Sequence, residues 1–93
     1  MVRTLTGSGN PCEAYARVAR DLEILRSSGL YIDRRGGLTS EGRALLAMIR
    51  RFLAINRLAC IEIAREAMRR SEKLESLYIC IEEKKAELGC PAE

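Results

Sequence analysis

The chain has 93 residues, enough for one domain (1–93) with a modest core, because short chains bury only about 60% of their unfolded surface. Its 47% apolar content excludes a disordered protein, and no segment approaches the ~18 uncharged apolar residues of a membrane span. The net charge of +3 is uneven, since residues 1–58 carry ten arginines and five acids, whereas residues 59–93 carry six bases and eight acids. A polyanion would therefore meet the first part of the chain.

Several residue types are absent or rare. The chain has no His, Trp or Gln and only two Asn, and its arginines outnumber its lysines thirteen to three. Depleted amides together with four cysteines are typical of disulfide-using hyperthermophiles, so we expect a hyperthermophilic archaeon or its virus. GC-driven codon bias is the alternative explanation. The N-terminus has no apolar signal-peptide core, which favours the cytoplasm.

The first predicted helix covers residues 11–28, after a flexible leader at 1–9. Asn10 is a good N-cap residue, Pro11 suits the first helical position and Glu13 completes a capping-box-like pattern. The apolar face of this helix recurs at steps of three and four residues: Tyr15, Val18, Leu22 and Leu25.

A short extended turn is predicted at residues 30–38. Leu30, Tyr31 and Ile32 favour extended backbone, and the sequence DRRGG at 33–37 is typical of a tight turn with glycine at positive φ. Thr39 then suits the N-cap of the next helix.

The remaining chain predicts two helices, at 40–69 and 72–88. Between Arg43 and Leu88 there is neither Gly nor Pro. The alternative is a single helix over 39–88 that pairs with a second chain as a coiled coil, but Ser71 and Glu72 after Arg70 favour a fold back at Arg70. One heptad stripe consists of Leu46, Ile49, Leu53, Asn56, Cys60, Ile63, Ala67, Leu74, Leu77, Ile81 and Leu88. A second apolar stripe beside it consists of Leu45, Met48, Phe52 and Ile55.

The cysteines help to choose between these two architectures. A bend at Arg70 sets Cys60 and Cys80 side by side, whereas one straight helix would hold them ~30 Å apart. Cys12 and Cys90 come to similar positions along the bundle axis and form the second predicted pair. Their positions match less closely than those of Cys60 and Cys80. Free buried thiols or a four-cysteine metal site are alternatives, although the spacings match no zinc pattern.

Candidate chemistry is confined to the arginines. Without His, and with the clustered acids Glu82, Glu83 and Glu87 on an expected solvated face, we predict no enzyme, no cofactor and no metal. Three arginines recur every seven residues and therefore lie in a stripe on one side of a helix, next to a second group of arginines at the turn. Such a surface can bind phosphates. The predicted nucleic-acid-binding residues are Arg43, Arg50 and Arg57 on the stripe, and Arg26, Arg34 and Arg35 at the turn. A solvated face of a thermostable bundle is the alternative explanation.

Residues 17–47 carry a family resemblance. Segments 22–30, 31–39 and 40–46, with the pattern Leu-Thr-x-x-Gly-Arg-x-Leu-Leu at 38–46, resemble the recognition helix, wing and following helix of archaeal winged-helix DNA-binding regulators. The resemblance implies that Arg17, Arg20 and Arg26 lie on a recognition helix and that Arg34 and Arg35 lie at a wing tip. In that family the last long helix dimerises.

The sequence therefore predicts an all-α fold, a small three-helix bundle stapled by disulfides, with helices at 11–28, 40–69 and 72–88. We expect a non-enzymatic nucleic-acid-binding or regulatory protein that does not enter membranes and possesses a homodimer surface of heptad-spaced apolar residues. The alternative is a helical adaptor or structural subunit that acts through protein contacts.

Overall fold

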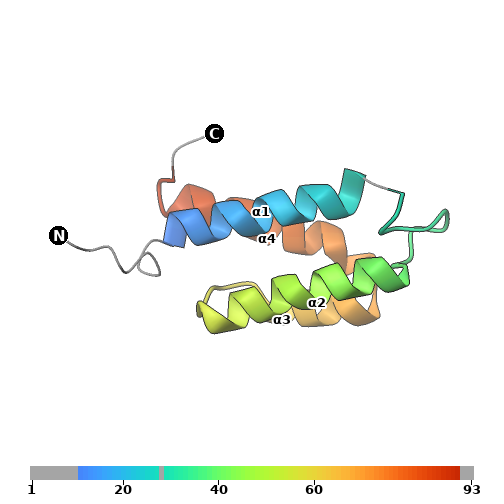
Figure 1. Ribbon diagram of the computed structural model, residues 1–93. Helices are drawn as coiled ribbons and strands as arrows, with labels where there is room; N and C mark the ends of the chain where they lie inside the picture. Colours follow the sequence, from blue (N-terminus) through green and yellow to red (C-terminus); the bar gives the residue numbers. More distant parts are fainter. Residues whose placement is uncertain (1–10, 28, 91–93) are drawn as a thin grey trace.

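The computed structural model describes residues 11–27 and 29–90, which form four α-helices (Figure 1). These are α1 (Pro11–Ser27), α2 (Ser40–Ile55), α3 (Ile61–Arg69) and α4 (Lys73–Glu87). The all-α prediction is confirmed, but the predicted count of three helices is wrong, because the expected helix 40–69 is divided into α2 and α3. The predicted leader and the Asn10 cap lie outside the described residues.

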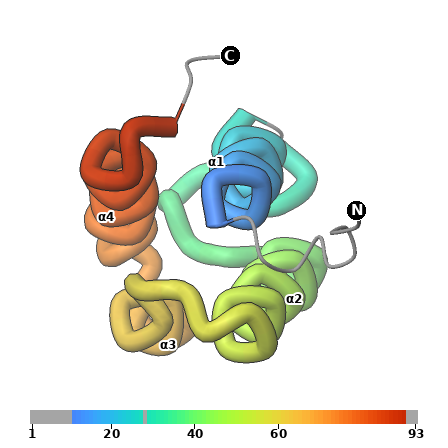
Figure 2. Tube along the Cα trace, turned by 90° about the vertical axis from the view of Figure 1, so that its left-hand side faces the viewer, coloured from blue at the N-terminus to red at the C-terminus, as the bar shows by residue number. Residues whose placement is uncertain are grey.

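Successive helices run in opposite directions and occupy the corners of a square (Figure 2). Each helix packs against two neighbours, in the pairs α1–α2, α2–α3, α3–α4 and α1–α4. The pairs α1–α3 and α2–α4 lie across the diagonals. The architecture is thus an antiparallel four-helix bundle in which α2 and α4 run in the same direction and their outer sides point away from each other (Figure 2).

The core receives side chains from all four helices. It confirms most of the predicted heptad stripe, with Leu46, Ile49 and Leu53 fully buried on α2, but Leu88 at the end of that stripe is 46% exposed. No polar or charged residue within 11–27 and 29–90 is buried. The buried side chains are Tyr15, Val18, Ala19, Leu22, Leu25, Leu46, Ile49, Leu53, Leu58, Ala64, Ala67, Leu74, Leu77 and Ile81.

The predicted turn at 30–38 is present, held by one antiparallel bridge between Ile32 and Leu38. The Asp33 carboxylate accepts hydrogen bonds from the backbone N–H groups of Arg35 (2.9 Å) and Gly37 (2.8 Å). Gly36 has the expected positive φ of 87°. This side-chain acceptor fixes the tip of the turn locally, while Tyr31, Ile32 and Leu38 at its base pack against the core.

The start of α2 is fixed by Thr39 and Gly42. The Thr39 hydroxyl accepts a hydrogen bond from Gly42 N–H (3.0 Å) and donates one to the Leu30 carbonyl (2.7 Å), so it caps the helix as predicted. A Cβ at Gly42 would lie 2.1 Å from the Tyr31 carbonyl oxygen, so only glycine permits the turn to pack on α2.

The turn between α2 and α3 corrects the prediction of one helix over 40–69. Arg57 adopts a left-handed φ of 56° just after the end of α2. Its N–H donates to the Ala54 carbonyl (3.2 Å), and the Leu58 N–H donates to the Leu53 carbonyl (2.9 Å). This pair of bonds is a Schellman motif, with the buried Leu58 as its apolar partner. The sequence lacks the glycine that normally marks this motif. The sequence therefore gives no local signal that α2 ends here.

The bend at Arg70 is confirmed. Arg70 has extended backbone (φ −135°), and its carbonyl accepts from Lys73 N–H (2.9 Å) to begin the next turn. Ser71, a possible cap residue by its type, does not cap α4: the N-cap position is Glu72 and no side-chain cap bond forms there, although the Ser71 carbonyl accepts from Leu74 N–H (3.0 Å).

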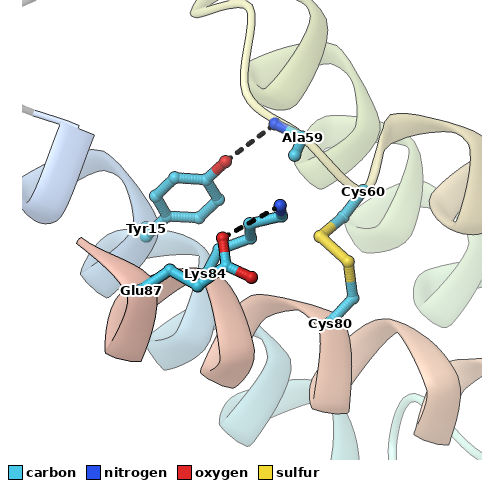
Figure 3. The surroundings of a disulfide bond; sticks show 6 residues. All are labelled: Tyr15, Ala59, Cys60, Cys80, Lys84 and Glu87. Carbon is cyan, nitrogen blue, oxygen red and sulfur yellow. Dashed lines mark hydrogen bonds and ion pairs between the residues drawn. A yellow bond between two sulfur atoms is a disulfide. The ribbon is translucent and has the colours of Figure 1, made fainter.

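Two disulfides close the bundle, as predicted. Cys60, just before α3, is bonded to Cys80 in the middle of α4, and nearby the Tyr15 hydroxyl accepts a hydrogen bond from Ala59 N–H (2.8 Å; Figure 3). Cys12 is bonded to Cys90 and ties the start of α1 to the residues just after α4. The first bridge therefore anchors the α2–α3 turn and the second joins the two ends of the bundle.

We expect Leu53→Ala to lower the free energy of unfolding by about 2–5 kcal/mol, because the substitution loses burial and leaves a cavity. Met48→Ala is the matched control on the same helix, since Met48 is 65% exposed and should change stability little. Chemical denaturation measures both. Near-equal losses would contradict the assignment of the inner face of α2.

Arg57→Gly should stabilise the protein by up to about 1 kcal/mol, because glycine adopts a left-handed backbone without steric cost. The same substitution at Arg51, inside α2, should destabilise by about 1 kcal/mol through lost helix propensity. Thermal unfolding distinguishes the two signs. Destabilisation by both variants would mean that the helix does not end at residue 55.

The two bridges predict that the native, non-reduced protein is lighter than its reduced form by four hydrogen atoms, two for each disulfide. Intact mass spectrometry measures this difference. Reduction should lower the free energy of unfolding by about 2–5 kcal/mol. Four thiols alkylated in the native, unreduced protein would refute the pairing.

Candidate nucleic-acid interface

An open groove runs between α2 and α3, with a volume of about 460 Å³. Arg50 lines it from α2, and Arg65 and Arg69, one helical turn apart, line it from α3. Met68 contributes an apolar side chain to the same groove. Three guanidinium groups from two helices thus border one surface depression.

The charge of the groove is only partly neutralised. Glu62 and Glu66 lie among the arginines, and Glu62 forms an exposed ion pair with Arg65 (3.2 Å). No ion pair within residues 11–27 and 29–90 involves Arg50 or Arg69. An exposed ion pair contributes little energy, so even Arg65 can exchange its carboxylate for a phosphate.

Two members of the predicted stripe remain on the same side of α2. Arg43 is exposed two turns before Arg50, which puts the two guanidinium groups ~10 Å apart along the helix. Arg57 is also exposed, but α2 ends before it and its backbone serves the Schellman turn. The seven-residue periodicity therefore does not extend to Arg57 in space.

Arg34 and Arg35 are exposed at the tip of the turn before α2. They lie at the end of the bundle where α2 begins, so Arg43 is the stripe residue on their side (Figure 1). Neither forms an ion pair with a described residue. These two side chains extend the basic surface beyond the groove.

Arg26 belongs to a different surface, between α1 and α4. Its guanidinium lies 4.5 Å from the centre of the Tyr78 ring and 3.8 Å from the Glu75 carboxylate. Tyr78 in turn donates a hydrogen bond to Glu23, and this bond raises the pKa of the Tyr78 hydroxyl. Arg26 thus contacts α4, and it does not line the groove that contains Arg50.

Arg65 and Arg69 were missed by sequence reasoning. Their signal is the spacing of four residues on one helix, which sets both on one face. A single helix over 40–69 would not place α3 beside α2, so the sequence pattern alone does not indicate that these arginines lie opposite Arg50. Only the turn at 56–60 brings them opposite Arg50.

The second predicted apolar stripe divides into two pairs. Leu45 and Phe52 pack against the core, and Arg17 of α1 covers the Phe52 ring at 5.2 Å. Met48 (65%) and Ile55 (71%) are the most exposed large apolar side chains among the described residues. The outer side of α2 therefore carries an apolar surface that no other described element covers.

Within the described chain, no three His, Cys, Asp or Glu side chains gather where they could hold a metal ion. None of its helices is both long and apolar enough to cross a membrane. The chain matches no protein-family model, no curated protein and no solved structure.

Proposed function

We propose that this protein is a small, non-enzymatic nucleic-acid-binding protein that contacts phosphates through the groove between α2 and α3. The observation that supports the proposal is the presence of Arg50, Arg65 and Arg69 around one open depression. Guanidinium groups form bidentate hydrogen bonds with phosphate oxygens, and such contacts carry affinity without reading sequence.

The extent of the basic surface supports binding to a chain of phosphates. Arg43 extends the basic surface along α2 beyond the groove, and Arg34 and Arg35 lie further on at the turn. Several phosphates of one strand can therefore be contacted together. The turn corresponds to the wing in the resemblance to winged-helix regulators, which is consistent with this use.

We place the protein in the cytoplasm of a hyperthermophilic archaeon or in its virus. The two disulfides indicate a non-reducing setting, and a hyperthermophilic cytoplasm is compatible with them because hyperthermophiles maintain disulfides inside the cell, whereas most cytoplasms keep thiols reduced. The absence of Gln and the scarcity of Asn agree with a high working temperature.

The second candidate function is that of a helical adaptor or structural subunit. The exposure of Met48 and Ile55 on one side of α2 favours it, because monomeric proteins rarely leave neighbouring large apolar side chains uncovered. A homodimer through this surface is the form that the heptad spacing suggests.

Affinity for duplex or single-stranded nucleic acid should fall steeply with salt, because each neutralised phosphate releases condensed counterions. Replacing Arg50 and Arg69 by Ala should flatten the log-log slope by about one to two units, at ~0.9 per duplex contact. Fluorescence anisotropy over a salt series measures the slope.

Replacing Arg34 and Arg35 together should also flatten the log-log slope of affinity against salt by about one to two units.

Replacing Lys84 and Lys85 by Ala is the control, since both lie on α4 and each is paired with a glutamate of that helix. Their loss should leave the slope unchanged. Failure of micromolar protein to retain DNA or RNA of any kind at low salt would overturn the proposal and favour the adaptor.

A further inference from the structure

The outer side of α4 is acidic with an apolar centre. Ile79 is 50% exposed there, and Glu75, Glu82 and Glu83 surround it at positions −4, +3 and +4 along the helix. The lysines of α4 are only half-exposed, whereas these glutamates are exposed. The side that α4 presents to solvent is thus one aliphatic side chain bordered by three carboxylates, and we name it the α4 knob. Glu75 and Glu82 also form long ion pairs, with Arg26 (3.8 Å) and Lys85 (4.0 Å), whereas Glu83 forms none with a described residue.

The outer side of α2 has the converse character. Ala47, Arg50, Arg51 and Ala54 follow the spacing i, i+3, i+4, i+7, and with Met48 they line a shallow hollow of about 400 Å³. Four residues at this spacing form the hole that accepts a knob from a facing helix. The two small side chains leave room at the centre and the two arginines border it. We name this hollow the α2 hole.

We propose that the α4 knob of one copy inserts into the α2 hole of a second copy. Ile79 fills the space between Ala47 and Ala54, and Glu82 and Glu83 meet Arg51. Charge complementarity identifies the occupant: residues 40–57 carry four arginines and one acid, whereas residues 72–87 carry five acids and three lysines. The exposed Met48 and Ile55 become covered by the same contact.

Charge also disfavours the symmetric alternative. A two-fold α2–α2 interface would bring Arg51 of one copy near Arg51 of the other, and an α4–α4 interface would oppose glutamates. Like charges placed across an interface suppress association. The contact is therefore heterologous, with a different surface on each side.

The bundle geometry decides what such a contact builds. α2 and α4 occupy diagonal corners, so the hole and the knob of one molecule face opposite directions and do not compete (Figure 2). A head-to-tail contact that does not return to its start continues as an open chain of copies. This self-association does not depend on nucleic-acid binding.

Sedimentation velocity of the oxidised full chain at low salt should show a mass that rises with protein concentration beyond twice the 10.4 kDa monomer. Arg51→Glu places a carboxylate against the α4 knob, and Ile79→Asn removes the apolar centre. Each variant should weaken self-association by about tenfold or more. Circular dichroism checks that both variants keep their helix content.

Mixing the two variants identifies the heterologous contact. Arg51→Glu keeps its α4 knob and Ile79→Asn keeps its α2 hole, so an equimolar mixture should form a one-to-one heterodimer and grow no further. A symmetric interface predicts no such complementation. Arg34→Glu and Ile24→Asn are the matched controls, with the same kinds of change on surfaces outside the contact, and should assemble like the unmodified chain.

Two results would overturn the proposal. One is an unmodified chain that remains monomeric at every concentration at low salt. The other is a chain that stops at a dimer while the two variants fail to complement each other. Neither result bears on the groove between α2 and α3, whose test is retention of nucleic acid.

Discussion

The short turn between α2 and α3 is the constraint on which the rest of the bundle depends. Three interactions hold it: the Schellman bonds around Arg57, the hydrogen bond from Ala59 N–H to Tyr15, and the Cys60–Cys80 disulfide. The first ends α2, while the other two attach the turn to α1 and α4. Two residues of the turn, Arg57 (φ 56°) and Cys60 (φ 77°), have a left-handed backbone that glycine would adopt more easily, and the Cys60–Cys80 disulfide and the Ala59–Tyr15 bond hold the turn in its place.

This turn also creates the surface on which the proposed function rests. With α3 beside α2, Arg65 and Arg69 border the same groove as Arg50. In a continuous helix the same arginines would be spread over more than 20 Å of one rod. The core needs none of them, because its buried side chains are apolar throughout the described residues. Arginine positions on α2 and α3 are therefore available for binding.

The two proposals use different sides of α2. The flank toward α3 borders the basic groove, and the outer flank carries Met48, Ile55 and the α2 hole. Arg50 lies at the boundary and contributes to both. Copies joined through the α2 hole and the α4 knob would each retain a groove, so a chain of copies would present several grooves to one polyanion.

The sequence by itself determined the all-α class and the turn at 30–38, and it favoured the bend at Arg70 over one long helix. Apolar periodicity and an Asp and Gly turn account for the first two. The Cys60–Cys80 pair follows from equal distances to the bend, whereas the Cys12–Cys90 pair rested on similar levels in the bundle and was the less secure prediction. Only the tertiary structure decided that α2 ends at Ile55, that Arg65 and Arg69 join Arg50, and that Arg26 binds to α4. The physical reason is that the turn after α2 is held in part by contacts distant in sequence, those of Ala59 with Tyr15 and of Cys60 with Cys80, whereas helix periodicity reflects only neighbours three or four residues apart.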